Sequence, residues 1–181
     1  YMAMYTNSIL LPFFLQEILK YNPLVTGLLI LPYSLTLSMI APVAGRLSGK
    51  YGSRYLTIAG PTVYCIALLM FTLYDKNVAM WQIVLASGIM GIGNGLFQSP
   101  SNNAIMTCVQ HGHVGLASGI LALSRNMGNI LGVAVTITLF ETFRKIFLDA
   151  GNVYDTAFLT AYRTTMCFGI FFGLSCLTFA F

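Results

Sequence analysis

The sequence predicts an all-α membrane protein built as a bundle of six transmembrane helices. Of its 181 residues, 57% are hydrophobic and only 8% are charged, and the mean hydropathy is +0.78. Soluble domains carry roughly 25% charged residues. The apolar residues form six long runs, and about 20 apolar residues suffice for a helix to cross a hydrocarbon core roughly 30 Å thick. We therefore expect an integral, multi-pass protein whose surroundings are the lipid bilayer.

The first three spans are expected at residues 1–18, 24–44 and 55–73. All three contain proline, which membrane helices tolerate because neighbouring helices satisfy the carbonyls that proline frees. Residues 45–54, which read GRLSGKYGSR, separate the second span from the third. We expect this basic link to be a loop in the head-group layer, because it carries three cations and no acid: Arg46, Lys50 and Arg54.

The last three spans are expected at residues 80–106, 115–140 and 157–181. The fourth begins near Trp81, a residue type that favours the membrane interface. Its second half is polar, so that half is not expected to face lipid. Residues 141–155 follow the fifth span as a polar stretch that we expect to lie at the interface. Both ends of the chain fall within apolar sequence, which favours a piece of a longer protein.

The distribution of charges predicts the orientation of the bundle. All five acids fall at the first, third and fifth connections, whereas the second and fourth connections have none. Lys and Arg resist translocation, so cytoplasmic loops are enriched in them. The number of cations differs little between the two sides of the membrane, but the cations are most densely spaced in the basic link. We place the basic link inside, in what we expect to be a bacterial cell membrane.

Several classes of site are not expected. The cations are dispersed over helix ends, so they form no nucleic-acid-binding face. The four cysteines lack the close pairing of a zinc or redox motif, and His111 and His113 lack further ligands, so no metal and no cofactor are expected. No acids or paired histidines converge within the spans, which argues against an enzyme.

A polar stripe on the fourth span is the first candidate binding surface. Asn94, Gln98 and Asn102 are four residues apart and therefore share one helix face. Such a stripe lines a cavity or pore, or forms a polar contact between helices, and we favour a cavity. In the first span, Asn7 and Phe14 are further candidates for this cavity, although Phe14 could equally face lipid.

Arg125 is the second candidate, because a cation near the centre of a membrane helix costs about 2.5–3.5 kcal/mol on insertion scales. Asn129 lies four residues on, on the same face. Two roles remain open for this pair: a structural arginine bound to backbone carbonyls, or a part in ligand binding or gating. No carboxylate lies at mid-membrane depth, so no acidic proton relay is visible.

Glycines four residues apart recur along the spans and predict close helix packing. The same faces could let helices slide during a transport cycle. The pairs are Gly45 and Gly49, Gly91 and Gly95, Gly115 and Gly119, Gly128 and Gly132, and Gly169 and Gly173.

The link GRLSGKYGSR resembles the loop signature of the major facilitator superfamily. A glycine is followed by a leucine, then by basic residues around a second glycine; the signature's acidic residue would fall at Gly49. Residues 115–135 resemble the penultimate helix of the fourteen-span drug and proton antiporters of this superfamily, and residues 11–35 resemble the opening of their C-terminal half. The matching signature positions are Gly45, Leu47, Lys50, Gly52 and Arg54.

The resemblance implies that residues 1–181 are the C-terminal six-helix bundle of a larger transporter, whose N-terminal half is absent from this sequence. In that fold the first and fourth helices line a central cavity, and the second and fifth lie at the interface between the halves. The implied activity is proton-coupled export of hydrophobic or cationic compounds by alternating access, with small molecules and protons as partners. The alternatives are a proton-coupled carrier of another solute, such as a siderophore or amino acid, a channel, and a structural bundle.

Overall fold

The fold is a bundle of six helices, as the sequence predicts. In the computed structural model, residues 2–75, 78–109, 113–149 and 154–180 are described, and no strand occurs among them. The elements are α1 (Met2–Phe13), the π-helix η1 (Phe14–Ile18), α2 (Pro23–Tyr51), α3 (Ser53–Thr72), α4 (Met80–Thr107), α5 (Val114–Asp149) and α6 (Tyr154–Ala180).

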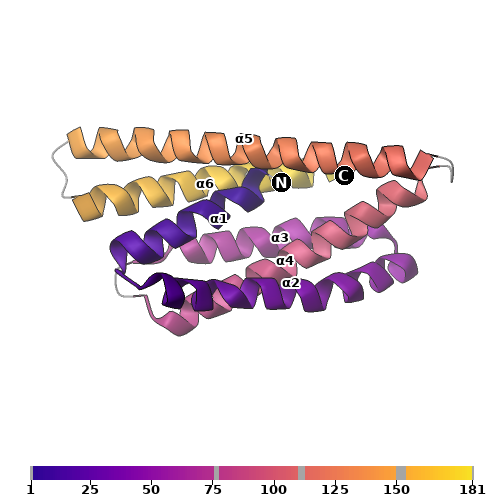
Figure 1. The fold of residues 1–181 in the computed structure, drawn as a ribbon, viewed down its shortest axis with the longest axis horizontal. Coiled ribbons are helices and arrows are strands. Elements are labelled where there is room, and N and C mark those ends of the chain that lie inside the picture. Colours follow the sequence, from indigo (N-terminus) through magenta and orange to yellow (C-terminus); the bar gives the residue numbers. More distant parts are fainter. Residues whose placement is uncertain (1, 76–77, 110–112, 150–153, 181) are drawn as a thin grey trace.

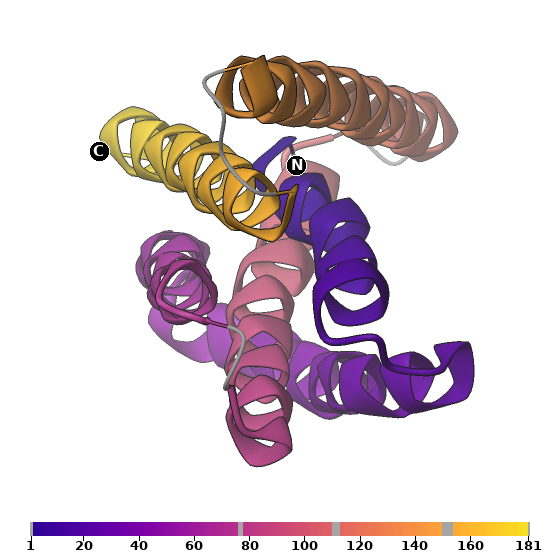
Figure 2. The same ribbon diagram turned by 90° about the vertical axis from the view of Figure 1, so that its left-hand side faces the viewer.

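The helices lie roughly along one axis, and their connections alternate between the two ends of the bundle (Figure 1). Viewed along that axis, α1, α5 and α6 form one group, and α2, α3 and α4 form the other (Figure 2). Within the second group, α4 packs extensively on both α2 and α3. Across the groups, the main contact joins α3 to α6.

Aromatic side chains fill the core between α1, α3, α5 and α6. The Phe140 ring lies 5.0 Å from the Phe158 ring, edge to face, which ties α5 to α6. The buried Tyr64 of α3 donates a hydrogen bond from its hydroxyl to the carbonyl oxygen of Met4, at 2.9 Å. Burial of these rings stabilises the bundle. The hydrogen bond satisfies the Tyr64 hydroxyl, which would otherwise be an isolated polar group in an apolar core.

Glycines on α4 set its close approach to both neighbours. A Cβ atom added to Gly93 would lie 2.6 Å from the backbone nitrogen of Tyr64 on α3. A Cβ atom added to Gly91 would overlap Thr36 and Tyr33 on α2. Because no side chain intervenes, backbone packs directly on backbone, as in other membrane helix pairs with small residues at the contact.

The glycine pairs divide into tight and open positions. Gly91, Gly95 and Gly173 all face a neighbouring atom that an added Cβ would approach to 3.0 Å or less. Gly49, Gly115 and Gly119 have nothing within 4 Å of an added Cβ. The prediction of close packing therefore holds at the first set but is wrong at the second within this bundle.

The basic link is not a loop. Helix α2 continues to Tyr51 and α3 begins at Ser53, so Gly52 alone makes the turn. Its φ of 86° and ψ of 147° belong to a region that essentially only glycine occupies. The loop-signature residues thus lie on two helix ends, where Lys50 and Arg54 are exposed. The expected loop was wrong because one glycine suffices to reverse the chain.

The polar stretch after the fifth span is mostly helix as well. Helix α5 continues from the predicted end at residue 140 to Asp149. Glu141 and Arg144 form an ion pair at 2.7 Å, and a spacing of three residues allows such a pair within one helix. Phe143 and Phe147 continue the apolar face and pack at the edge of the core. Polar composition alone did not reveal that this face continues.

The first span changes helix type before it ends. Helix α1 stops at Phe13, and η1 continues to Ile18 as a π-helix, which is rare and often marks functional positions. Lys20 then takes a positive φ of 55°. Asn22 caps α2 by accepting a hydrogen bond from the Leu24 N–H at 3.3 Å, directly before Pro23. The chain thus turns between the first and second expected spans.

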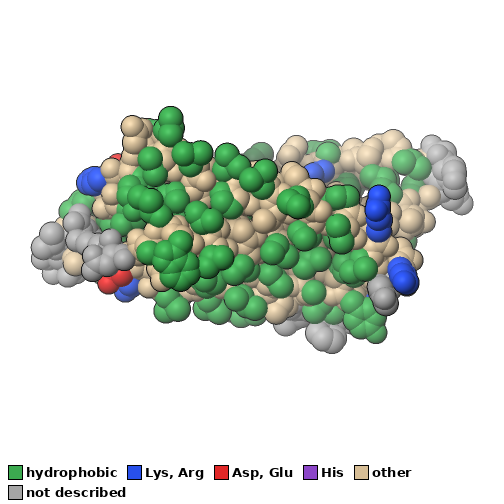
Figure 3. Space-filling model, turned by 90° about the horizontal axis from the view of Figure 1, so that it is seen from below, with side chains coloured by type: hydrophobic (Ala, Val, Ile, Leu, Met, Phe, Trp, Pro, Cys, Tyr) green, Lys and Arg blue, Asp and Glu red, His purple; other side chains and the backbone are tan. Residues whose placement is uncertain are grey.

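Four helices among the described residues are long and apolar enough to cross a membrane: 23–50, 53–72, 80–107 and 156–175. Helix α1 has only 12 residues, and the middle of α5 carries Asn126 and Asn129, which lower its hydropathy. The face in Figure 3 is hydrophobic over most of its length, and its acidic side chains lie at one end. Such a surface suits a bilayer.

Candidate functional site: a polar seam between α1, α2 and α4

Asn7 marks the point where α1 faces α4. Its side chain is 1% exposed, and its Nδ2 donates to the sulfur of Met90 at 3.0 Å. Its Oδ1 is buried and has no hydrogen-bond partner among the described residues. A buried amide oxygen without a partner costs free energy, so this atom is available to a water or a ligand.

Asn94 occupies the corresponding place between α4 and α2. Its Nδ2 donates a short hydrogen bond to the hydroxyl oxygen of Tyr33. Its Oδ1 is also buried and lacks a partner in the described part of the chain. The structure thus places Asn7 and Asn94, which are far apart in the sequence, on one polar seam formed by α1, α2 and α4.

A cavity of about 40 Å³ opens beside this seam. Its polar walls include Asn7, Ser8, Tyr33 and Ser87. The Ser87 hydroxyl is fully buried and finds no partner among the residues that the structure describes. A volume of this size, with several polar groups, is sufficient for ordered water. The seam therefore forms a polar site within an otherwise apolar bundle.

Three polar residues of the cavity wall, Ser8, Tyr33 and Ser87, are absent from the sequence-based candidates. Ser87 precedes Asn94 by seven residues, so helical periodicity puts it on the same face and could have identified it. Tyr33 carried no comparable signal, because its position depends on how α2 crosses α4.

Gln98 and Asn102 extend the face of Asn94 toward the end of α4. Both are partly exposed, and the Oδ1 of Asn102 is a buried atom without a partner among the described residues. Neither lines the 40 Å³ cavity. Asn94 is buried, whereas Gln98 and Asn102 are partly exposed, so the burial of the predicted stripe decreases along the helix.

Arg125 and Asn129 lie apart from this seam. Both are partly buried on α5, which packs mainly on α6 and α1. The Oδ1 of Asn129 is buried, and among the described residues it has no hydrogen-bond partner. Of the predicted site residues, Asn7 alone lines the 40 Å³ cavity. Asn94 bonds Tyr33, which also lines it, whereas Arg125 and Asn129 lie elsewhere.

Phe14 belongs to the core. Its side chain has no exposed surface and stacks on Tyr162 of α6, with ring centroids 4.9 Å apart and an interplanar angle of 22°. It therefore does not face lipid, and it does not line the cavity beside Asn7.

The profile of the Major Facilitator Superfamily matches residues 1–181, the whole chain. The chain belongs to the major facilitator superfamily. Members of this superfamily are transporters rather than enzymes, which agrees with the sequence prediction. With its long apolar helices and bacterial relatives, this superfamily chain is an integral, multi-pass membrane protein.

Three curated relatives illustrate the similarity. The multidrug resistance protein Stp of Mycobacterium tuberculosis is 33% identical over 135 residues, covering 75% of this chain and 25% of Stp. The riboflavin transporter RibZ of Clostridioides difficile is 29% identical over 166 residues, covering 89% of this chain and 36% of RibZ. The lincomycin resistance protein LmrB of Listeria monocytogenes is 26% identical over 152 residues, covering 84% of this chain and 32% of LmrB. The chain thus spans about a quarter to a third of their length.

A solved structure carries the same fold. It is that of a bacterial homologue of the human drug peptide transporters PepT1 and PepT2, and it matches this chain with a TM-score of 0.71 at 19% sequence identity. The match covers 98% of this chain and 38% of that one. At this identity the likeness concerns the arrangement of the helices, which is that of a major facilitator bundle.

Proposed function

We propose that the chain is the C-terminal half of a transporter that exports hydrophobic or cationic compounds in exchange for protons. The observation that carries the proposal is the polar seam of Asn7, Ser87 and Asn94, with orphaned polar atoms in an apolar bundle. Helices α1 and α4, which form the seam together with α2, are the first and fourth helices of the bundle. The similarity to the multidrug resistance protein Stp and the lincomycin resistance protein LmrB supports drug export.

The proposed mechanism is alternating access around the seam. A preceding six-helix partner would complete the cavity, and this bundle would rock against that partner. The partly exposed Gln98 and Asn102 would contact substrate beyond the enclosed part of the seam. Arg125 and Asn129, on α5, would act at the interface between the halves. Among the seam residues there is no carboxylate, so the proton-binding group would belong to the partner.

Export by inverted vesicles containing the full-length protein tests this proposal. We expect a fluorescent lipophilic cation to accumulate, and an uncoupler to abolish the accumulation. Gln98→Ala and Arg125→Ala should lower the initial rate several-fold. Thr62→Ala is the matched control, because its exposed hydroxyl bonds only its own helix in α3. Unchanged export by both variants would remove Gln98 and Arg125 from the mechanism.

A carrier of a defined metabolite is the second candidate, and the similarity to the riboflavin transporter RibZ favours it. In the same vesicles this candidate predicts no accumulation of lipophilic cations. Uptake or efflux of a panel of labelled metabolites would then identify the solute.

A further inference from the structure

A second cavity lies away from the seam, where α1, η1, α5 and α6 meet. Its volume is about 140 Å³. Residues from the end of α1 and the start of α6 line it. These two helix ends lie at the same end of the bundle (Figure 1). Four aromatic rings line it: Phe13, Phe140, Tyr154 and Phe158. Phe140 and Phe158 are buried, whereas Phe13 is 53% exposed.

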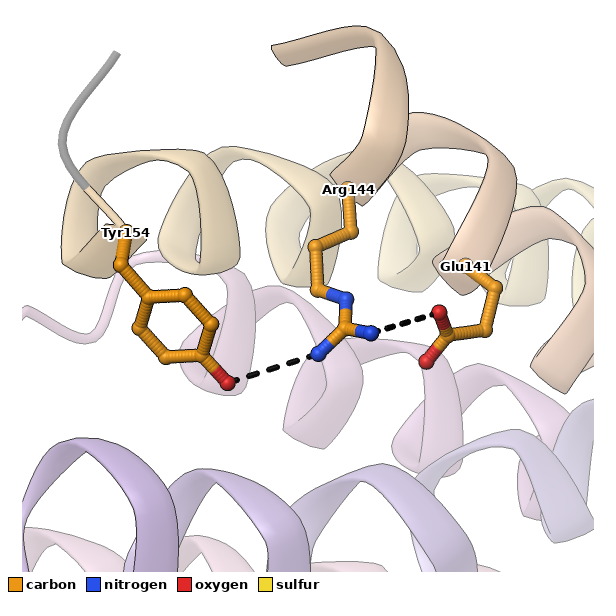
Figure 4. A network of polar contacts seen from close by, with 3 residues as sticks. All are labelled: Glu141, Arg144 and Tyr154. Carbon is orange, nitrogen blue, oxygen red and sulfur yellow. Dashed lines mark hydrogen bonds and ion pairs between the residues drawn. The ribbon is translucent and has the colours of Figure 1, made fainter. Parts of the chain in front are cut away.

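Three charged side chains share this cavity: Glu17, Glu141 and Arg144. Arg144 lies between Glu141 and Tyr154 (Figure 4), with its Nη2 2.7 Å from Glu141 Oε2 and its Nη1 3.4 Å from the Tyr154 hydroxyl. The guanidinium thus offsets the charge of Glu141. Two carboxylates and one guanidinium leave a formal charge of −1, which is that of Glu17.

Glu17 is only weakly compensated. Its contact with Lys20 is 3.9 Å long, and the two side chains are 46% and 73% exposed. Exposed ion pairs of this kind contribute little stabilising free energy, because water screens the attraction between the two charges. The cavity therefore combines aromatic rings with a net negative charge.

We propose that this cavity binds the head group of an organic monocation, such as a quaternary ammonium that carries an aromatic or alkyl substituent. Aromatic faces attract such cations through the ring quadrupole, and cages of aromatic residues recognise quaternary ammonium groups. Glu17 supplies the opposite charge. A small hydrated metal ion is not suited to the site, because apolar walls cannot replace its water. The volume admits a head group, and the remainder of the ligand extends through the opening.

Protection of a cysteine from a thiol reagent tests the proposal in the full-length protein. Its four cysteines in this chain are first replaced, and Ile137→Cys is introduced into the cavity wall, where Ile137 is 44% exposed. The probe is benzyltrimethylammonium. We expect it to slow labelling of this cysteine about tenfold at saturation, whereas its neutral isostere neopentylbenzene gives no protection. Ile130→Cys, on the same helix but outside the cavity, should be labelled at an unchanged rate.

Glu17→Gln removes the charge with little change in shape. We expect it to raise the probe concentration for half-protection about fivefold to tenfold, in line with the strength of a cation's attraction to such a site. Asp75→Asn removes an acid at the same end but outside this cavity, and should leave that concentration unchanged. Equal protection by the neutral isostere would show an apolar occupant, such as lipid, and overturn the proposal. Absence of protection, or no effect of Glu17→Gln, would also overturn it. The assay measures binding, so its result is independent of whether the protein exports cations.

Discussion

Gly93 sets how closely α3 and α4 can approach, because an added Cβ would lie 2.6 Å from the Tyr64 backbone nitrogen. We expect Gly93→Ala to destabilise the bundle by about 1–3 kcal/mol, the usual cost of overpacking. The measurement is the thermal midpoint of the detergent-solubilised protein. Gly119→Ala is the control, since nothing lies within 4 Å of its Cβ, and alanine's higher helix propensity should leave the midpoint equal or higher. Equal midpoints for both variants would contradict the close contact.

Tyr74, in the turn after α3, provides a prediction of pH dependence. Burial raises the pKa of its hydroxyl from 10.0 to about 12, and the hydroxyl donates to the Gln82 carbonyl oxygen at 2.7 Å. The fold thus favours the neutral phenol. Its contribution to stability is complete below pH 10 and is lost as the pH rises from 10 toward 12. We expect Tyr74→Phe to be less stable at neutral pH and to show a smaller loss of stability over that interval. A pH series of thermal midpoints would reveal this, and identical slopes would refute it.

At the scale of elements, Gly52 joins α2 to α3 in a single residue with φ of 86°. Any side chain there strains the backbone, so we expect Gly52→Ala to lower the thermal midpoint, with a cost of about 1–3 kcal/mol. Gly49→Ala is the control, because it makes the same substitution three residues earlier, inside α2, where an added Cβ meets nothing within 4 Å. Only the first variant should be destabilised. Comparable midpoints would mean that the turn tolerates other residues.

The helices could be predicted from apolar runs, whereas their ends could not. The basic residues near Gly52 resemble a loop in composition, but composition does not show that one positive φ is sufficient to turn the chain. Residues after Phe140 are polar enough to suggest an interfacial stretch. That these residues also have an apolar face becomes evident only from the packing of Phe143 and Phe147 against the core. Local patterns thus predict elements better than boundaries.

At the scale of the whole molecule, alternation of the connections predicts which residues share a side of the membrane. Lys20 and Asp75 lie at one end of the bundle, and Arg54 and Cys108 belong to connections at the other (Figure 1). In intact cells, an impermeant thiol reagent should label Lys20→Cys and Asp75→Cys. Arg54→Cys and native Cys108, which is exposed, should be labelled only after permeabilisation. The reverse pattern would invert the predicted orientation, and mixed labelling at one end would contradict the bundle's topology.

The site could be predicted in part. Helical spacing correctly placed Asn94, Gln98 and Asn102 on one face of α4. It could not show that Asn7 meets that face, because 83 residues separate Asn7 from its partner Met90. Nor could it show that Phe14 stacks on Tyr162. Long-range contacts depend on how whole helices cross, which no local pattern encodes.

The one-residue connection at Gly52 also constrains biosynthesis. Helices α2 and α3 have almost no slack between them, so they would leave the translocon together as a unit rather than one after the other. Arg46, Lys50 and Arg54 surround the tip of that unit. Carrying three cations through hydrocarbon is costly, so the ribosome-facing compartment would retain the tip during synthesis. The same glycine that reverses the chain would thereby make α2 and α3 enter the membrane as a pair.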